Sequence, residues 1–188
     1  SLRLRLAMRV SNVAPALAEE QAKAALDSKN GGVLETANET VGQYGIRNPL
    51  GGVAGWSEVY MNASLESYLK GYNDPRIKSY FNLAQDGRDK EGNIIKEVAG
   101  VKQLNSIEGE YKGVRQGTGV ADNRYSTHSQ TAITTGSKII VMSAAEVWFL
   151  RAEAALRNYT SENVENCYKQ GITVSFAQWD ASGVSEYL

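Results

Sequence analysis

The feature that most limits the possible fold is a pair of amphipathic segments late in the sequence. Ser143, followed three residues later by Glu146, matches the capping box that starts a helix. Met142 and Val147 flank this pair as the hydrophobic staple that accompanies such a start. The pattern predicts a helix that runs to about Asn158, with two neighbouring apolar stripes.

A second helix is expected after only a few more residues, capped by Thr160 or Ser161. Its apolar stripe consists of Val164, Tyr168, Ile172, Phe176 and Trp179. Two helices joined by so short a connection pack antiparallel. The sequence therefore predicts a helical hairpin over residues 143–179.

This hairpin matches the tetratricopeptide pattern, in which bulky and small residues let two helices approach closely. The matching positions are Trp148, Ala152, Val164, Tyr168 and Gly171. Arg151 stands where a Leu is usual. Because one such unit cannot bury its own apolar face, neighbouring helices must cover it.

Two more helices are predicted near the start of the sequence. Leu2, Leu4 and Leu6 alternate as in a strand, but the residue types favour a helix, and Leu2, Leu6 and Val10 also have helical spacing. Pro15 suits the first position of the second helix. The small-residue stripe of that helix, which ends at residues 30–32, consists of Ala18, Ala22, Ala25 and Leu26.

The middle of the chain is expected to be rich in loops. Residues 33–53 show no sustained period and contain many Gly, Asn and Thr residues, so we assign a loop around residues 48–52. Asn62 is expected to cap a helix that ends at residues 73–75, since the residue before a proline resists helical geometry. The predicted inner face of that helix consists of Leu65, Tyr68, Leu69 and Tyr72.

Extended structure is predicted on either side of a long irregular region. Residues 77–84 and 94–98 suggest a small β-hairpin around a polar turn at residues 86–93. Residues 101–135 should be irregular, and residues 138–142 should be extended. The predicted fold is mainly α, with tetratricopeptide-type helical hairpins, long irregular loops and a small β-hairpin, in one region that spans residues 1–188.

Composition excludes several classes of function. The 188 residues carry 20 Lys plus Arg against 21 Asp plus Glu, a formal charge of −1, so no net field draws the protein to nucleic acid or to an anionic membrane. Apolar runs such as residues 139–142 are far shorter than the roughly 20 residues that cross a bilayer. A single cysteine and a single histidine exclude a Cys-based zinc site and most His-ligated metal chemistry. We expect no metal and no cofactor.

No catalytic residue is predicted. His128 lies in a polar segment without a nucleophile elbow, and Cys167 lies within an amphipathic helix, where a packed structural thiol is expected. Glu146 and Glu153 share a helix face but are about 10.5 Å apart along the axis, beyond the spacing of a glycosidase pair.

Aromatic residues are concentrated in the loop-rich middle: Trp56, Tyr60, Tyr68, Tyr72, Tyr80, Phe81, Tyr111 and Tyr125. Flat rings with polar edges are what a sugar-binding face requires, although most of these rings should be core. Trp56, Tyr111 and Tyr125 lie in the irregular segments and are therefore the candidate glycan-binding residues.

Four stretches of the sequence resemble the SusD/RagB-like family. Residues 143–154, with an Ala-Glu pair ahead of an Arg-Ala-Glu-Ala run, resemble its signature helix. Residues 2–13 resemble its Leu-Arg-Leu-Ala-Met-Arg segment, residues 73–76 its Asp-Pro-Arg turn, and residues 168–179 the helix after the signature. Their order and spacing fit across nearly the whole chain.

The resemblance implies a surface-exposed outer-membrane lipoprotein of a nutrient-uptake system. Such a protein binds an oligosaccharide or polysaccharide, acts as the lid of a TonB-dependent transporter, and is not an enzyme. Family members are much longer, so we expect this chain to be an interior fragment that lacks the secretion signal and the lipid anchor. The anchor would be its only link to the membrane.

Two other functions stay open from the sequence. A helical-repeat module that binds a protein or peptide would show an aromatic face without a saccharide response. A carbohydrate-active enzyme would need two carboxyl groups that converge in a cleft.

Overall fold

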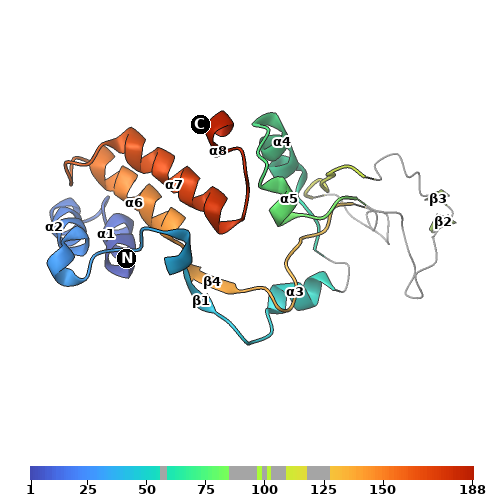
Figure 1. The fold of residues 1–188 in the computed structure, drawn as a ribbon, viewed down its shortest axis with the longest axis horizontal. Helices are drawn as coiled ribbons and strands as arrows, with labels where there is room; N and C mark the ends of the chain where they lie inside the picture. The colour runs from blue at the N-terminus through green and yellow to red at the C-terminus, as the bar shows by residue number, and fades with distance from the viewer. Residues whose placement is uncertain (56–58, 85–96, 99–100, 103–108, 118–127) are drawn as a thin grey trace. The chain divides into compact units, whose positions relative to one another are not determined.

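The computed structural model describes residues 1–55, 59–84, 97–98, 101–102, 109–117 and 128–188 (Figure 1). Within these residues the chain is mainly helical, and its strands form small two-stranded antiparallel sheets, which confirms the predicted fold class. The chain forms two compact units. Unit 1 comprises residues 1–43, 139–186 and 188, and unit 2 comprises residues 44–138 and 187.

Unit 1 contains most of the long helices. These are α1 (Leu2–Arg9), α2 (Pro15–Leu26), α6 (Ala144–Leu156) and α7 (Val164–Gln178), with the short α8 at Val184–Tyr187. Helices α6 and α7 lie side by side as the predicted hairpin, and α1 packs against both α2 and α6 (Figure 1). Neighbouring helices therefore cover part of the hairpin.

The start of α6 follows the predicted pattern in part. Ser143 Oγ accepts a hydrogen bond of 3.1 Å from the Glu146 N–H, and Met142 and Val147 are buried in one cluster. The Glu146 carboxylate, however, accepts hydrogen bonds of 2.6 and 2.5 Å from Arg5. The second half of the capping box is thus replaced by an ion pair that ties α6 to α1.

Helix α7 begins later than predicted. Its cap is Asn163, whose side chain accepts a hydrogen bond from the Asn166 N–H, and not Thr160 or Ser161. Along this helix Gly171 lies against Phe149 of α6, and a Cβ atom at this position would be 2.8 Å from the Phe149 ring. The close approach of the two helices therefore depends on this glycine.

The apolar face of α1 differs from the predicted one. Leu4, Ala7 and Met8 are buried in a cluster with Ala18 and Ala22 of α2, whereas Leu2 and Leu6 are more than half exposed. Both faces of this helix carry leucines, so spacing alone did not identify the buried one. In α2 the predicted alanines Ala18, Ala22 and Ala25 are buried, but the helix ends at Leu26 rather than at residues 30–32, and a 3-10 turn at Ser28–Asn30 follows it.

A two-stranded sheet completes unit 1. Strand β1 (Val41–Gln43) pairs antiparallel with β4 (Ile139–Met142), with Val41 opposite Met142. The extended segment before α6 is confirmed. The loop predicted around residues 48–52 is wrong, because helix α3 (Pro49–Ala54) begins there. The stretch before it, for which no period was found, includes a 3-10 turn at Ala37–Glu39 and strand β1.

Unit 2 consists of short elements joined by irregular segments. They are α3 (Pro49–Ala54), α4 (Ala63–Gly71), α5 (Ile77–Tyr80), β2 (Glu97–Val98) and β3 (Val101–Lys102). Strands β2 and β3 pair antiparallel, so a small hairpin is present, but not the predicted one. The strand predicted at residues 77–84 begins instead as α5, and the turn predicted at residues 86–93 lies outside the described residues.

Side-chain caps explain two of these elements. Asn48 accepts a hydrogen bond from the Leu50 N–H, and Pro49 occupies the first turn, so α3 begins where we predicted a loop. Asn62 caps α4 as predicted, accepting a bond of 2.7 Å from the Ser64 N–H.

Candidate functional site

The irregular part of unit 2 is held together by backbone hydrogen bonds between distant segments. The Met61 N–H donates to the Ser129 carbonyl at 2.7 Å, and the Ala63 N–H donates to the Val114 carbonyl at 2.8 Å. The Ala84 N–H donates to the Glu110 carbonyl at 2.7 Å. These bonds hold the segments around residues 61, 84, 112 and 129 beside one another, although these segments do not form regular strands.

Aromatic side chains pack on the small core that this framework encloses. The core consists of Met61, Leu69 and Ile77, and the half-buried rings against it are Tyr80, Phe81 and Tyr111. The Tyr80 and Phe81 rings meet edge to face with centroids 6.5 Å apart. Tyr111, one of the three candidate glycan-binding residues, therefore packs against a buried apolar cluster. Trp56 and Tyr125 lie outside the described residues.

The face of α4 predicted to be buried is exposed. The exposed fractions are 65% for Tyr68, 68% for Tyr72 and 39% for Leu65. Of the predicted inner face only Leu69 is buried, and Glu66 is buried beside it. Two tyrosines one helical turn apart therefore present their rings to solvent, as a stacking surface for a sugar would require.

Glu66 is a nearly buried carboxylate that links α4 to the segment of Tyr111. Its Oε2 accepts a hydrogen bond of 2.8 Å from the Gly113 N–H, and its Oε1 accepts one of 3.0 Å from Lys70 Nζ. Lys112 Nζ lies 3.5 Å from the same Oε1. Burial alone would raise the pKa of Glu66, but these partners outweigh it and lower the pKa below its ordinary value. The charged carboxylate is thus the form that this environment favours.

The groups weighed for nucleophilic chemistry lie in unfavourable surroundings. Burial, assisted by the positive charge of Lys112, lowers the pKa of His128. Cys167 is buried in α7, as predicted, and burial raises the pKa of its thiol. Across the described residues, no three side chains of the His, Cys, Asp and Glu types lie together as a metal site would require.

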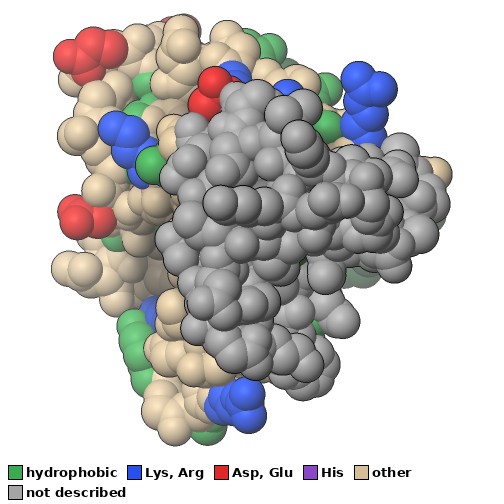
Figure 2. All heavy atoms as spheres, turned by 90° about the vertical axis from the view of Figure 1, so that its right-hand side faces the viewer, with side chains coloured by type: hydrophobic (Ala, Val, Ile, Leu, Met, Phe, Trp, Pro, Cys, Tyr) green, Lys and Arg blue, Asp and Glu red, His purple; other side chains and the backbone are tan. Residues whose placement is uncertain are grey.

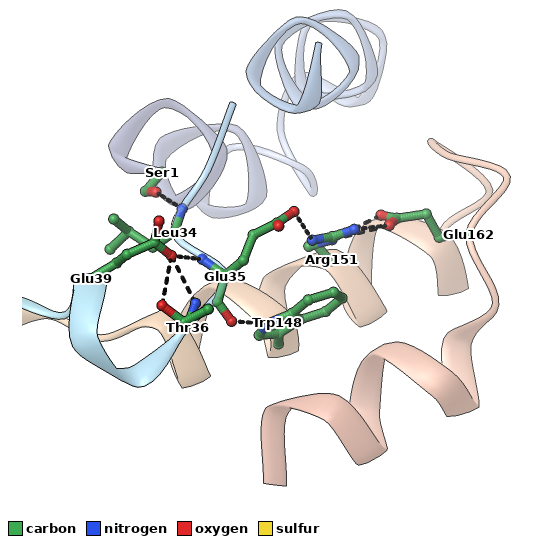
Figure 3. Close-up of polar contacts among 8 residues, drawn as sticks. All are labelled: Ser1, Leu34, Glu35, Thr36, Glu39, Trp148, Arg151 and Glu162. Carbon is green, nitrogen blue, oxygen red and sulfur yellow. Dashed lines mark hydrogen bonds and ion pairs between the residues drawn. The ribbon is translucent and has the colours of Figure 1, made fainter. Parts of the chain in front are cut away.

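A second polar cluster surrounds Arg151 in unit 1 (Figure 3). Arg151 forms a two-point ion pair with Glu162, in which Nε lies 3.0 Å from Oε1, and its Nη1 lies 3.2 Å from a carboxylate oxygen of Glu35. Its guanidinium stacks on Trp148, whose indole N–H donates a bond of 2.8 Å to the Glu35 carbonyl. Arg151, which replaces the Leu usual at this repeat position, is therefore paired with two carboxylates and stacked on an indole ring.

A cavity of about 690 Å³ adjoins this cluster, with Glu35, Arg151 and Glu162 among its lining residues. Another, of about 610 Å³, lies where α1, α6 and α7 meet and is lined by Phe149, Trp179 and several polar side chains. Neither cavity holds one of the predicted site residues.

Two surface properties bear on partners. On the side shown in Figure 2, the described Lys and Arg residues are scattered among Asp and Glu rather than gathered in one patch. Of the helices that the structure describes, none combines the length and the hydropathy needed to cross a bilayer.

The chain matches a family model described as "SusD-like: Susd and RagB outer membrane lipoprotein" over residues 1–188. A comparison with curated proteins finds no match.

Solved structures give close matches. A SusD homologue from Bacteroides vulgatus is 41% identical, with a TM-score of 0.82, and the match covers 100% of this chain and 36% of that one. A chitin-binding SusD homologue from Flavobacterium johnsoniae is 35% identical, with a TM-score of 0.79 and coverage of 99% and 36%. A SusD homologue from Bacteroides uniformis is 31% identical, with a TM-score of 0.80 and coverage of 100% and 37%. The chain thus spans little more than a third of the length of these relatives.

Proposed function

The chain belongs to the SusD-like family of outer-membrane lipoproteins, and from this membership we propose that the protein captures glycans at the bacterial cell surface. It delivers them to a TonB-dependent transporter in the outer membrane, to which a lipid anchor attaches the protein. It binds without catalysis and needs no cofactor.

The proposal is supported by the match to the family and by the binding activity named for one relative. The family match extends over the whole chain, and a relative that is 35% identical over 99% of it is a chitin-binding protein. At this similarity the fold is shared, and the binding surface can differ in its loops. A neutral or N-acetylated saccharide also suits a chain whose formal charge is −1.

The proposed binding surface lies in unit 2. Tyr111, Trp56 and Tyr125 stack on sugar rings, while neighbouring Asn, Asp and Arg side chains hydrogen-bond the hydroxyl groups. The exposed rings of Tyr68 and Tyr72 add a second place where a saccharide could stack. Tyr111 packs against the buried cluster of Met61, Leu69 and Ile77, and such support favours a ring that is oriented before a ligand binds.

The test is a binding screen with the full-length protein. Affinity electrophoresis against a panel of polysaccharides, including soluble chitin derivatives, is followed by calorimetry with oligosaccharides of each positive glycan. We expect at least one hit that weakens on Tyr111→Ala and on Trp56→Ala or Tyr125→Ala. Tyr168→Ala in unit 1 serves as a matched control, because this tyrosine is also exposed but belongs to the helical hairpin.

A second candidate function is a helical-repeat module that binds a protein. It is favoured by the exposed apolar side chains of α1 and α2, where Leu2, Leu6 and Leu17 line a groove of about 470 Å³. A stable protein complex together with silence across the whole glycan panel would favour this function over glycan capture.

A further inference from the structure

We propose that Glu66 is a positioning residue of the glycan-binding surface, one that holds the segment of Tyr111 in place without touching the ligand. This inference rests on the proposed function, because it concerns how that surface is held. Its physical basis is a single carboxylate that pairs with Lys70 in its own helix and, in the segment of Tyr111, with the Gly113 backbone N–H and the Lys112 side chain.

The attachment point is close to the ring that it would position. Gly113 is two residues after Tyr111, and its N–H donates to Glu66 Oε2 at 2.8 Å. On the other side of Gly113, the Val114 N–H donates to the Met61 carbonyl at 2.8 Å. The backbone that follows Tyr111 is therefore held at two points, by Glu66 of α4 and by Met61, which precedes α4.

The contact between Gly113 and the start of α4 leaves no space for a side chain at this position. A Cβ atom at this position would be 2.7 Å from the backbone carbonyl of Asn62, so the segment lies directly on the start of α4. Because Gly113 is buried, its N–H would lose its acceptor if Glu66 were removed and would have no ready access to water. Loss of the carboxylate should therefore shift the segment rather than leave it in place.

The titratable groups around Glu66 come from three parts of the chain. Lys70 lies on α4, Lys112 lies on the segment itself, and His128 interacts electrostatically with Glu66 from the neighbouring segment. A buried carboxylate is costly unless it is paired and hydrogen-bonded, and here both conditions hold. We infer that the buried Glu66 carboxylate serves to hold the segment that it bonds in one position. The nearest aromatic ring on that segment is Tyr111.

The test is a double-mutant cycle for glycan binding. The Kd for chitin oligosaccharides, or for the panel glycan that binds most tightly, is measured in the full-length protein with Glu66→Ala, Tyr111→Ala and both changes. We expect Glu66→Ala alone to raise Kd roughly five-fold, and to have less than about a two-fold effect once Tyr111 is already alanine. Losses that multiply in the double variant would overturn the inference, as would a folded Glu66→Ala protein with unchanged affinity.

Two control variants distinguish a loss of positioning at Tyr111 from a general loss of stability caused by removing an ion pair. Lys70→Met removes the ion pair within α4 but keeps the Gly113 bond, so its Kd should stay near the wild-type value. Glu19→Gln removes the equivalent pair with Lys23 in unit 1 and should have no effect. If Glu66→Ala does not fold, Glu66→Leu takes its place, since it fills a similar volume and offers no acceptor to the Gly113 N–H.

Hydrogen exchange keeps the inference testable if the wild-type protein binds no glycan. In that case the proposed function fails, and the amides of residues 111–114 still report whether Glu66 holds the segment. Faster exchange there in Glu66→Ala, or in Glu66→Leu where the alanine variant does not fold, with the α6 amides unchanged, would support the holding role. Unchanged exchange at Gly113 would overturn it.

Discussion

The guanidinium carbon of Arg151 lies 3.7 Å from the centroid of the Trp148 ring, so the two side chains stack one turn apart on α6. Stacking covers the face of the guanidinium and leaves its edges to Glu162 and Glu35. One side chain thereby joins α6 to the connection before α7 and to the segment around residue 35. The Leu usual at this repeat position could pack but could make none of these links.

Replacing Arg151 should therefore destabilise unit 1. We expect Arg151→Leu to lower the free energy of unfolding by about 2 kcal/mol, because it leaves Glu162 without its partner in a partly buried site. Urea denaturation measures this change. Arg157→Leu on the same helix is the matched control, since its pair with Glu153 is more exposed, and it should cost less than about 0.5 kcal/mol. Equal losses would contradict the special role of Arg151.

The approach of α6 and α7 should depend on Gly171. Gly171→Ala would place a methyl group 2.8 Å from the Phe149 ring, which itself packs against Tyr168 at 5.5 Å between centroids. We expect a loss of about 1–3 kcal/mol from overpacking, read as a lower melting temperature. Gly71→Ala is the control, because a Cβ atom there meets nothing within 4 Å, and it should leave stability equal or higher. An unchanged melting temperature in Gly171→Ala would show that the two helices can move apart without loss of stability.

The stability that Glu66 contributes should depend on pH. Its pKa is lowered in the folded state, so the ionised group stabilises the fold above the unfolded pKa, and this stabilisation disappears as the pH falls through the folded pKa. We expect wild type to exceed Glu66→Gln in free energy of unfolding at pH 7, with the difference shrinking below about pH 5. Urea denaturation at pH 7, 5 and 3 measures it. A difference that is constant over this range would contradict the assigned cause of the pKa shift.

The Cys167 thiol should be unreactive in the folded protein. It is buried, and burial raises its pKa, so little thiolate forms and reagents cannot reach it. A thiol-specific dye at pH 7.5 should label the native chain slowly and the urea-unfolded chain at once. Since residues 1–188 contain one cysteine, labelling of this chain reports a single site. Rapid labelling of the native chain would mean that α7 opens readily.

Much of unit 1 could be predicted because its signals are local. The cap at Ser143, the staple of Met142 and Val147 and the small residues of α2 act within one helix or its first turn, and all appear in the structure. A local signal for α3 was also present, since Asn48 and Pro49 form a cap and a first turn, but the glycines that follow concealed it. In α1 both faces carry leucines, and only its packing on α2 selects one of them.

Unit 2 was harder because distant partners decide its arrangement. Glu66 is buried on α4 because Gly113 and Lys112, distant in sequence, satisfy its charge, and the opposite face with Tyr68 and Tyr72 is left exposed. No periodicity within α4 contains that information. The strand predicted at residues 77–84 failed for a related reason: Asp74 accepts a hydrogen bond from the Arg76 N–H, and this turn leads into a helix.

We propose that this protein binds glycans through aromatic rings of unit 2. The most direct test is calorimetry of the full-length protein with chitin oligosaccharides and with each positive glycan from the panel, for wild type, Tyr111→Ala and the Tyr168→Ala control. We expect saturable binding that weakens with Tyr111→Ala, by roughly ten-fold for the loss of one stacked ring, and is unchanged in the control. No binding across the panel, or equal affinity in wild type and Tyr111→Ala, would contradict it.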